Sequence, residues 1–210
     1  MIRMEDPRVE TKRERSRRAR EAVVRFVALL AVTSLISVAA LYSWSFMSCF
    51  SEAKLVPELG EYPLVRVLFY GSGRGSVSAR FSLYDTAGRE FSVIDRSWSA
   101  QSLSIDFTTA TFSGRTFVFP YRIRPSEAEH GGTRLSHYYL DRRQCMLLGS
   151  PCTPRQKLAM FRLAVFALSA TTKVESRFST VQSVNLAQCA MGRTYDILVG
   201  ADGTLRLVAL

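Results

Sequence analysis

The sequence predicts a mainly β protein of the α+β class, in which an N-terminal transmembrane helix precedes an antiparallel β-rich domain of the sandwich or roll type. Three observations predict this class: an uncharged run from Phe26 to Phe50, a succession of short alternating strands, and a helix-capping pattern near residues 153–169 that marks one packed helix. The expected organisation is a basic cytoplasmic tail over residues 1–21, a signal-anchor helix over 22–50, a linker over 51–62 and the β-rich domain over 63–210.

The uncharged run of 25 residues is long enough to cross a membrane. A helix that rises about 1.5 Å per residue covers about 37 Å over this length, and the hydrocarbon core of a bilayer is about 30 Å thick. Aromatic residues near the C-terminal end of the run are of the kind that settle at a membrane–water interface. The residues expected to anchor the helix are Arg25, Phe26, Leu29, Leu30, Leu35, Ile36, Leu41, Tyr42, Trp44 and Phe46.

The charge of the flanking tail predicts the orientation of this helix. Residues 1–25 contain nine Lys or Arg and five acidic residues, and a basic flank beside a first span stays in the cytoplasm. We therefore expect a single pass through the cytoplasmic (inner) membrane, with the N-terminus inside and residues 63–210 on the extracytoplasmic, periplasmic side of a cell envelope.

Three kinds of processing are open for the same segment. Its length favours an uncleaved signal anchor, because the apolar region of a secretory signal has about 7–15 residues. The stretch Phe46-Met47-Ser48-Cys49 resembles a lipobox without its usual first Leu, which makes Cys49 a candidate for lipidation. Val38-Ala39-Ala40 resembles an ordinary cleavage site. All three alternatives place the β-rich domain on the same side of the membrane.

Composition argues against a nucleic-acid-binding or cofactor-dependent protein. The net charge of +10 comes partly from the tail, and the arginines of the domain are scattered singly without a recognised nucleic-acid-binding module. No metal-ligand spacing and no cofactor fingerprint is present in the sequence. About 160 residues follow the span, enough to bury a core without metal ions. We expect no nucleic-acid partner, no metal and no small-molecule cofactor.

The cysteines of the domain leave two alternatives. Cys145 and Cys152 are spaced closely enough for a disulfide in an oxidising compartment, with Cys189 left over. The alternative is that the cysteines are buried in the core as small apolar side chains.

Five strands are predicted in the first half of the domain. Apolar residues alternate in them with Ser, Thr and Arg, which predicts a sheet with one solvated side. The glycine-rich stretch 71–76 lacks the spacing of a phosphate-binding loop, so a hairpin connection is expected there. The strands are residues 63–71, 76–85, 89–98, 101–112 and 116–124, of which the last four form two hairpins.

Residues 125–142 interrupt this pattern with a polar stretch. They contain His130 and His137 together with Glu127 and Glu129, the four side chains on which an enzyme would have to be built. Their spacing differs from that of a metal-binding helix, and no nucleophile or cofactor motif accompanies them. We therefore predict a surface connection and a protein that is not an enzyme.

The rest of the chain predicts one helix and a last hairpin. Thr153, Pro154 and Gln156 form the start of a helix with a capping box. Its apolar stripe is expected to be buried against the sheet, and a central strand is the alternative. The stripe consists of Leu158, Phe161, Val165 and Leu168, widened by Ala159, Leu163 and Phe166. After weak alternation over 171–188, residues 193–200 and 204–210 flank the turn Asp202-Gly203.

Together these features predict a membrane-anchored envelope protein whose β-rich domain is a protein-binding or assembly module. Its expected partners are the lipid bilayer and another envelope protein. The alternative is a membrane-anchored or lipoprotein domain that binds carbohydrate or peptidoglycan through stacking aromatic side chains. The aromatic residues available for stacking are Trp98, Tyr121, Tyr138 and Tyr139.

Overall fold

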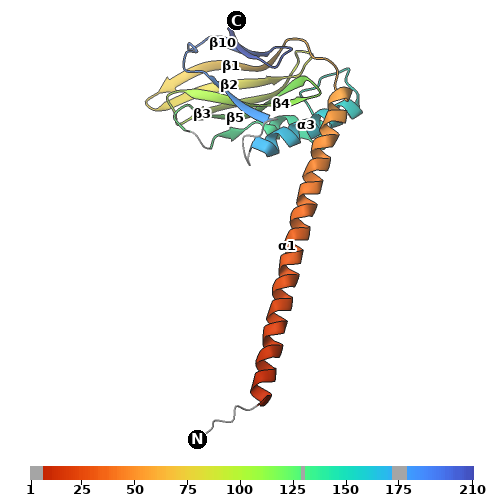
Figure 1. Ribbon diagram of the computed structural model, residues 1–210. Coiled ribbons are helices and arrows are strands. Elements are labelled where there is room, and N and C mark those ends of the chain that lie inside the picture. The colour runs from red at the N-terminus through yellow and green to blue at the C-terminus, as the bar shows by residue number, and fades with distance from the viewer. Residues whose placement is uncertain (1–6, 129–130, 172–178) are drawn as a thin grey trace. The chain divides into compact units, whose positions relative to one another are not determined.

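The structure is a computed structural model that describes residues 7–128, 131–171 and 179–210. The chain forms two compact units, Met1–Phe46 and Met47–Leu210. The main elements of the described residues are one apolar N-terminal helix, antiparallel sheets and one packed helix (Figure 1). The predicted class, mainly β with some α, is confirmed.

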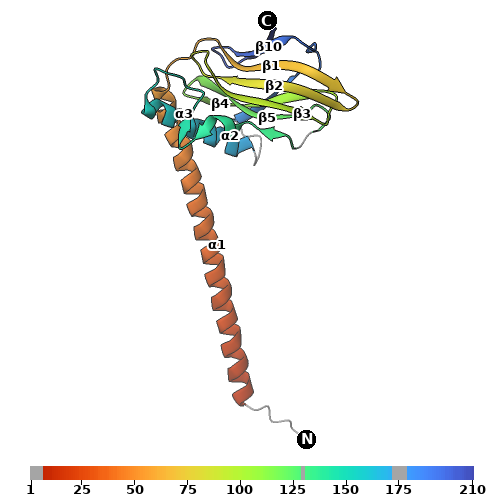
Figure 2. The same ribbon diagram turned by 180° about the vertical axis from the view of Figure 1, so that it is seen from behind.

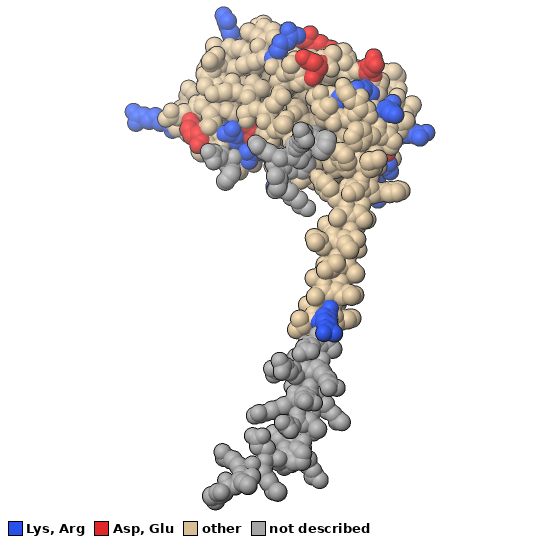
Figure 3. All heavy atoms as spheres, in the orientation of Figure 1, with Lys and Arg blue, Asp and Glu red and all other residues tan. Residues whose placement is uncertain are grey.

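Helix α1 extends from Pro7 to Leu55, so it begins earlier and ends later than the predicted range 22–50. Its segment Val23–Leu55 is long and apolar enough to cross a membrane, and the most apolar part has no residue buried in the structure. Figure 3 shows the long stretch of α1 without charged side chains. Such a helix fits a retained membrane span and equally a signal sequence. Of the ten predicted anchor residues, nine are exposed and Phe46 is half-buried.

The last two turns of α1 belong to the second unit. Cys49 and Ala53 are buried there, Val56 is buried directly after the helix, and β1 begins at Tyr62. The predicted linker 51–62 is therefore wrong for its first half, because the chain stays helical to Leu55 and contributes apolar side chains to the core.

Five strands form the first sheet, in the antiparallel order β11-β10-β1-β2-β3. Its inner face is apolar: Val65, Phe81 and Ile197 have no exposed surface. Its outer face carries polar pairs such as Arg66 with Asp196, as predicted for a sheet with one solvated side. The strands are β1 (Tyr62–Gly73), β2 (Ser76–Tyr84), β3 (Glu90–Trp98), β10 (Thr194–Val199) and β11 (Leu205–Ala209).

Four strands form the second sheet, in the order β6-β5-β4-β9. The two sheets are layered, and helix α3 (Pro154–Thr171) packs on the other face of the second sheet, against β4, β5 and β9 (Figure 1). Because β4 is covered from both sides, only one of its residues, Thr111, is exposed. The strands are β4 (Leu103–Phe112), β5 (Arg115–Pro125), β6 (Thr133–Arg134) and β9 (Ser179–Asn185).

Helix α3 begins with the predicted capping box. The backbone N–H of Gln156 donates to Oγ1 of Thr153 at 3.3 Å, and the N–H of Thr153 donates to Oε1 of Gln156 at 2.8 Å. Ala159, Leu163 and Phe166 are buried as expected. The rest of the predicted stripe does not face the sheet, because small side chains on the neighbouring face allow a closer approach. The buried residues are Ala159, Met160, Leu163, Ala164, Phe166 and Ala167, whereas Leu158, Phe161, Val165 and Leu168 lie on the outer face.

The described residues of the polar stretch 125–142 contain regular secondary structure. It contains β6, the short helix α2 (Ser136–Tyr139) and β7 (Leu140–Asp141), which pairs with β8 (Gln144–Cys145). The short helix α2 is labelled in Figure 2, and it contacts β5. The Tyr139 side chain is fully buried, and its hydroxyl donates to the carbonyl oxygen of Pro120 at 2.9 Å. This buried contact fixes the stretch to β5.

The C-terminal hairpin forms as predicted. The N–H of Gly203 donates to the carbonyl oxygen of Gly200 at 2.9 Å, and Oδ1 of Asp202 accepts from the N–H of Thr204 at 3.0 Å. Gly203 has a φ of 85°, and a Cβ built there would lie 2.4 Å from Cγ2 of Thr116 in β5. Only glycine fits this turn, both for its backbone angle and for its closeness to the second sheet.

Candidate protein-binding site at a sheet edge

Of the four polar side chains on which an enzyme would have to be built, the structure describes two. Glu127 and His137 are both exposed, and Glu129 and His130 lie outside the described residues. Among the described residues, no group of three or more His, Cys, Asp or Glu side chains is placed to hold a metal ion.

The four aromatic residues considered for carbohydrate stacking do not form an exposed row. Trp98 and Tyr139 are buried in the core. Tyr121 is half-buried beneath the guanidinium of Arg122, whose Cζ lies 5.2 Å from the ring centre. Tyr138 is exposed. The four rings therefore offer no continuous stacking surface for a sugar chain.

Of the two alternatives for Cys145 and Cys152, the structure has the free thiols and no disulfide between them. Cys145 is fully buried, whereas Cys152 is half-buried just before α3. Burial raises the pKa of the Cys145 thiol to about 12, although the N–H groups of Leu147 and Leu148 oppose this rise. The burial of Cys145 is what the alternative of a small apolar side chain expects. Cys49, the candidate for lipidation, is also buried.

A buried ionic cluster on the second sheet was not foreseen from the sequence. Asp106 of β4 is 1% exposed and accepts hydrogen bonds from Nε of Arg122 at 2.7 Å, from Nε of Arg124 at 2.9 Å and from the Ser183 hydroxyl. Burial acts to raise the pKa of Asp106, but these three donors outweigh it and lower the pKa below its ordinary value. The cluster joins β4, β5 and β9, which is a structural role.

Arg115 joins the β4–β5 hairpin to the C-terminal end of α1. Its guanidinium donates to the carbonyl oxygens of Ala53 at 2.7 Å, Val56 at 2.6 Å and Pro57 at 2.5 Å. These carbonyls include the unpaired ones at a helix C-terminus, where a cation is favoured. We call this set of contacts the Arg115 clamp.

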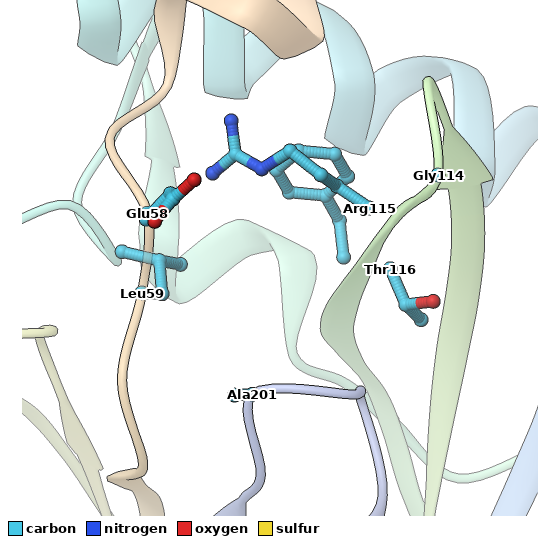
Figure 4. A pocket seen from close by; sticks show the side chains of 7 residues that line it. Glu58, Leu59, Gly114, Arg115, Thr116 and Ala201 are labelled. Carbon is cyan, nitrogen blue, oxygen red and sulfur yellow. The ribbon is translucent and has the colours of Figure 1, made fainter.

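The Arg115 clamp borders a small cavity (Figure 4). The Arg115 side chain reaches from the hairpin towards the segment that holds Glu58 and Leu59, and Ala201 lies at the other side of the cavity. The volume of about 230 Å³ is below the range of about 300–1,000 Å³ usual for ligand pockets. The guanidinium is already hydrogen-bonded to three carbonyls, so most of its donors are taken and the cavity is a weak candidate for a ligand site.

The candidate for a protein-binding feature is the outer edge of β11. This strand pairs only with β10 among the described residues and is the last strand of its sheet. Val208 is 40% exposed and Leu210 is 66% exposed, so apolar side chains accompany the open backbone. An exposed apolar strand edge is a template for pairing with another chain.

The register of the hairpin shows which backbone groups of β11 are available. Thr204 accepts from the N–H of Gly200, and the N–H of Leu210 donates to Thr194. In an antiparallel pair such bonded positions recur at every second residue. The even-numbered residues of β11 therefore bond to β10, and the N–H and C=O groups of Leu205, Leu207 and Ala209 point outwards.

The other sheet edges are less suited to pairing. The opposite edge of the first sheet, β3, carries charged, exposed Glu90, Asp95 and Arg96, the kind of residues that protect a strand edge. In the second sheet, β6 has only two residues, and β9 exposes mostly polar side chains. By comparison, β11 has a single charged residue, Arg206, which is paired with Glu61.

Compared with protein families, curated proteins and solved structures, the chain shows no match to any of them. A function has to be inferred from the site itself, because a sandwich architecture alone implies none.

Proposed function

We propose that this chain is a single-pass envelope protein whose β-rich domain binds a partner protein by strand addition along β11. In this mode an extended segment of the partner pairs with an open sheet edge, so that main-chain hydrogen bonds give affinity and side-chain pockets give specificity. The single observation that carries the proposal is the open edge, with outward backbone groups at Leu205, Leu207 and Ala209.

The proposed location is the cytoplasmic (inner) membrane, with the N-terminus inside and the domain on the extracytoplasmic side. The apolar helix and its basic flank support this orientation. Burial of Cys49 favours a retained anchor over a lipidated one, since acylation of this thiol requires it to leave the core. Fatty-acid labelling of wild type and Cys49→Ala tests this point, and labelling that disappears in the variant would overturn the retained anchor.

A photocrosslinking amino acid at the edge tests the binding proposal in intact cells. Placed at Val208 of β11, it should capture a partner protein, whereas the same group at Val93 of β3 should not. The two valines are 40% and 43% exposed, so accessibility is matched and only the sheet edge differs. Equal capture from both positions, or from neither, would contradict binding along β11.

A proline substitution separates backbone pairing from side-chain contact. Ala209→Pro removes an outward N–H without removing a bond to β10, and Ala209→Val keeps that N–H. Loss of one main-chain hydrogen bond together with the clash of the ring should weaken partner binding about tenfold or more, which corresponds to about 1.4 kcal/mol. Co-purification should fall for Ala209→Pro and persist for Ala209→Val. Equal co-purification of both variants would exclude strand addition at this residue.

A further inference from the structure

The outer face of α3 is an apolar stripe that the rest of the described domain covers only in part. Leu158, Phe161 and Leu168 are half-buried, and Val165 is 43% exposed. The four side chains recur at three- and four-residue spacing, which places them on one side of an α-helix. This is the stripe that the sequence marks as buried, so its exposure on the finished domain requires an explanation.

Basic residues flank this stripe on both sides. At about 100° per residue, Lys157 falls along one border of the stripe, and Arg155 and Arg162 fall along the other. The 18 residues of α3 include no Asp or Glu. An apolar face bordered by Lys and Arg is typical of a helix that lies in the interfacial layer of a membrane.

The position of α3 in the chain keeps it close to the proposed membrane span. Arg162 forms an ion pair with Glu52 at the end of α1, and the Phe112 ring contacts both Phe50 and Phe166 at centroid distances of 5.7 Å. Glu52 is six residues after Phe46, the last predicted anchor residue, and six residues span at most about 21 Å. Chain length alone therefore holds Arg162 near the outer end of the apolar run.

A hollow lies beside the border of the stripe that Arg155 and Arg162 form. Ser51, Glu52 and Leu55 of α1 line it together with Arg155, Leu158 and Arg162 of α3, and its volume is about 290 Å³. Glu52 is engaged by Arg162, whereas Arg155 has no ion-pair partner in the described part of the domain. An anionic phosphate at this place would complement the remaining positive charge.

We propose that the outer face of α3 lies on the surface of an anionic lipid bilayer, with Leu158, Phe161, Val165 and Leu168 at the acyl boundary and Arg155, Lys157 and Arg162 among the headgroup phosphates. This inference rests on the proposed membrane anchoring, which brings the surface within reach. The occupant is lipid, because α3 itself contributes only basic residues to the borders of the stripe, of which Arg155 has no ion-pair partner in the described residues, and because α1 ties the stripe to the end of the span.

Photolabelling from the lipid phase tests this inference on the full chain. The protein is reconstituted in bilayers of phosphatidylcholine with about one third phosphatidylglycerol, containing a phospholipid with a photoactivatable group near its glycerol end, and adducts are mapped by mass spectrometry. Adducts within residues 26–50 report the anchor, and adducts within residues 155–168 report the α3 surface. The two proposals therefore have separate readouts in one sample.

Matched variants test which residues of α3 are responsible for its labelling by lipid. Val165→Glu should remove the α3 adducts, and Val93→Glu, at a position with the same 43% exposure, should leave them unchanged. Replacing Arg155 and Lys157 by Gln should lower α3 labelling by up to about 25-fold, about fivefold per charge, because each basic residue near an anionic surface contributes about 1 kcal/mol. Replacement of the exposed turn residues Arg74 and Arg142 by Gln should have little effect.

The outcomes distinguish the alternatives. Labelling of residues 26–50 without labelling of α3 overturns the inference and leaves the anchor intact. Crosslinks between the α3 helices of two copies also overturn it, because the stripe is then a protein interface. Labelling of neither segment refutes both proposals. If Val165→Glu fails to fold, judged by tryptophan fluorescence, the Arg155 and Lys157 substitutions at the helix surface still decide the result.

Discussion

Removal of the Arg115 guanidinium should loosen the join between α1 and the β-rich domain. In the structure this one side chain donates hydrogen bonds to three carbonyl oxygens, those of Ala53, Val56 and Pro57. Its Cζ also lies 5.3 Å from the centre of the Phe117 ring. Arg115→Ala removes all of these contacts and leaves the carbonyls at the end of α1 to be hydrated.

The expected loss follows from the kind of bonds removed. A hydrogen bond with one charged partner contributes about 1.5–3 kcal/mol, and a cation–π contact contributes about 0.5–1 kcal/mol at a partly exposed site. The three bonds share one side chain and water replaces part of them, so the sum is not additive. We expect Arg115→Ala to lower the free energy of unfolding by about 3 kcal/mol, which for a domain of this size is a fall in Tm of about 6–12 °C.

Thermal unfolding of the full chain in detergent micelles, followed by tryptophan fluorescence, measures this change. Trp98 is buried in the first sheet and reports on the domain. Arg74→Ala is the matched control, since Arg74 is an exposed residue of the β1–β2 turn and should change Tm by less than about 2 °C. Arg115→Lys keeps the charge but lacks the planar fork, so its Tm should fall between those of Arg115→Ala and wild type.

Hydrogen exchange locates the effect. The amides of residues 50–56 should exchange faster in Arg115→Ala than in wild type, whereas the relative exchange rates among the amides of the central strand β4 should stay the same. A Tm for Arg115→Ala within about 2 °C of wild type, with unchanged exchange at residues 50–56, would refute the role assigned to the Arg115 clamp.

Three further predictions concern turns, charge and thiols. Gly203→Ala should lower the free energy of unfolding by about 3 kcal/mol, because it adds a steric clash to the strain of a positive φ. Gly192 has a similar φ but no atom near the position of a Cβ, so Gly192→Ala should lower it by only about 1 kcal/mol. Denaturant titrations measure both values. The lowered pKa of Asp106 stabilises the fold above about pH 4, and this stability is lost as the pH falls through the folded-state value. Asp106→Asn should therefore lower the free energy of unfolding by about 3 kcal/mol at pH 7, and this free energy should fall less steeply than that of wild type as the pH is lowered. The same pH dependence in both proteins would contradict this. In the folded protein without reductant, maleimide should modify Cys152 but not buried Cys145, which mass spectrometry measures. If neither thiol reacts until the protein is reduced, the two cysteines form a disulfide.

The strands of the domain were predictable because their signals are local. Alternating apolar residues and the turn at Asp202-Gly203 define the last hairpin without reference to any other part of the chain. The capping box at Thr153 and Gln156 is local in the same way, and the structure forms it as expected.

The features that the sequence did not reveal depend on partners far along the chain. The stretch after Phe50 looks polar and linker-like, but Glu52 is paired with Arg162, 110 residues later. The outer and inner faces of α3 are both apolar in sequence, so periodicity alone could not decide which face meets the sheet. Asp106 occupies an ordinary strand position, and only the register of β4 with β5 and β9 brings its three donors together.

The pairing of β1 with β10 has a consequence for how the domain is made. Tyr62 pairs with Val199, so the first strand of the sheet has one neighbour that is synthesised more than 130 residues later. Contacts of such long range are slow to form, and until they do, β1 presents an unpaired apolar edge. If the domain is exported as proposed, its first sheet can be completed only after β10 has crossed the membrane. Folding is then a late event after translocation, and general periplasmic chaperones should bind the chain in that interval.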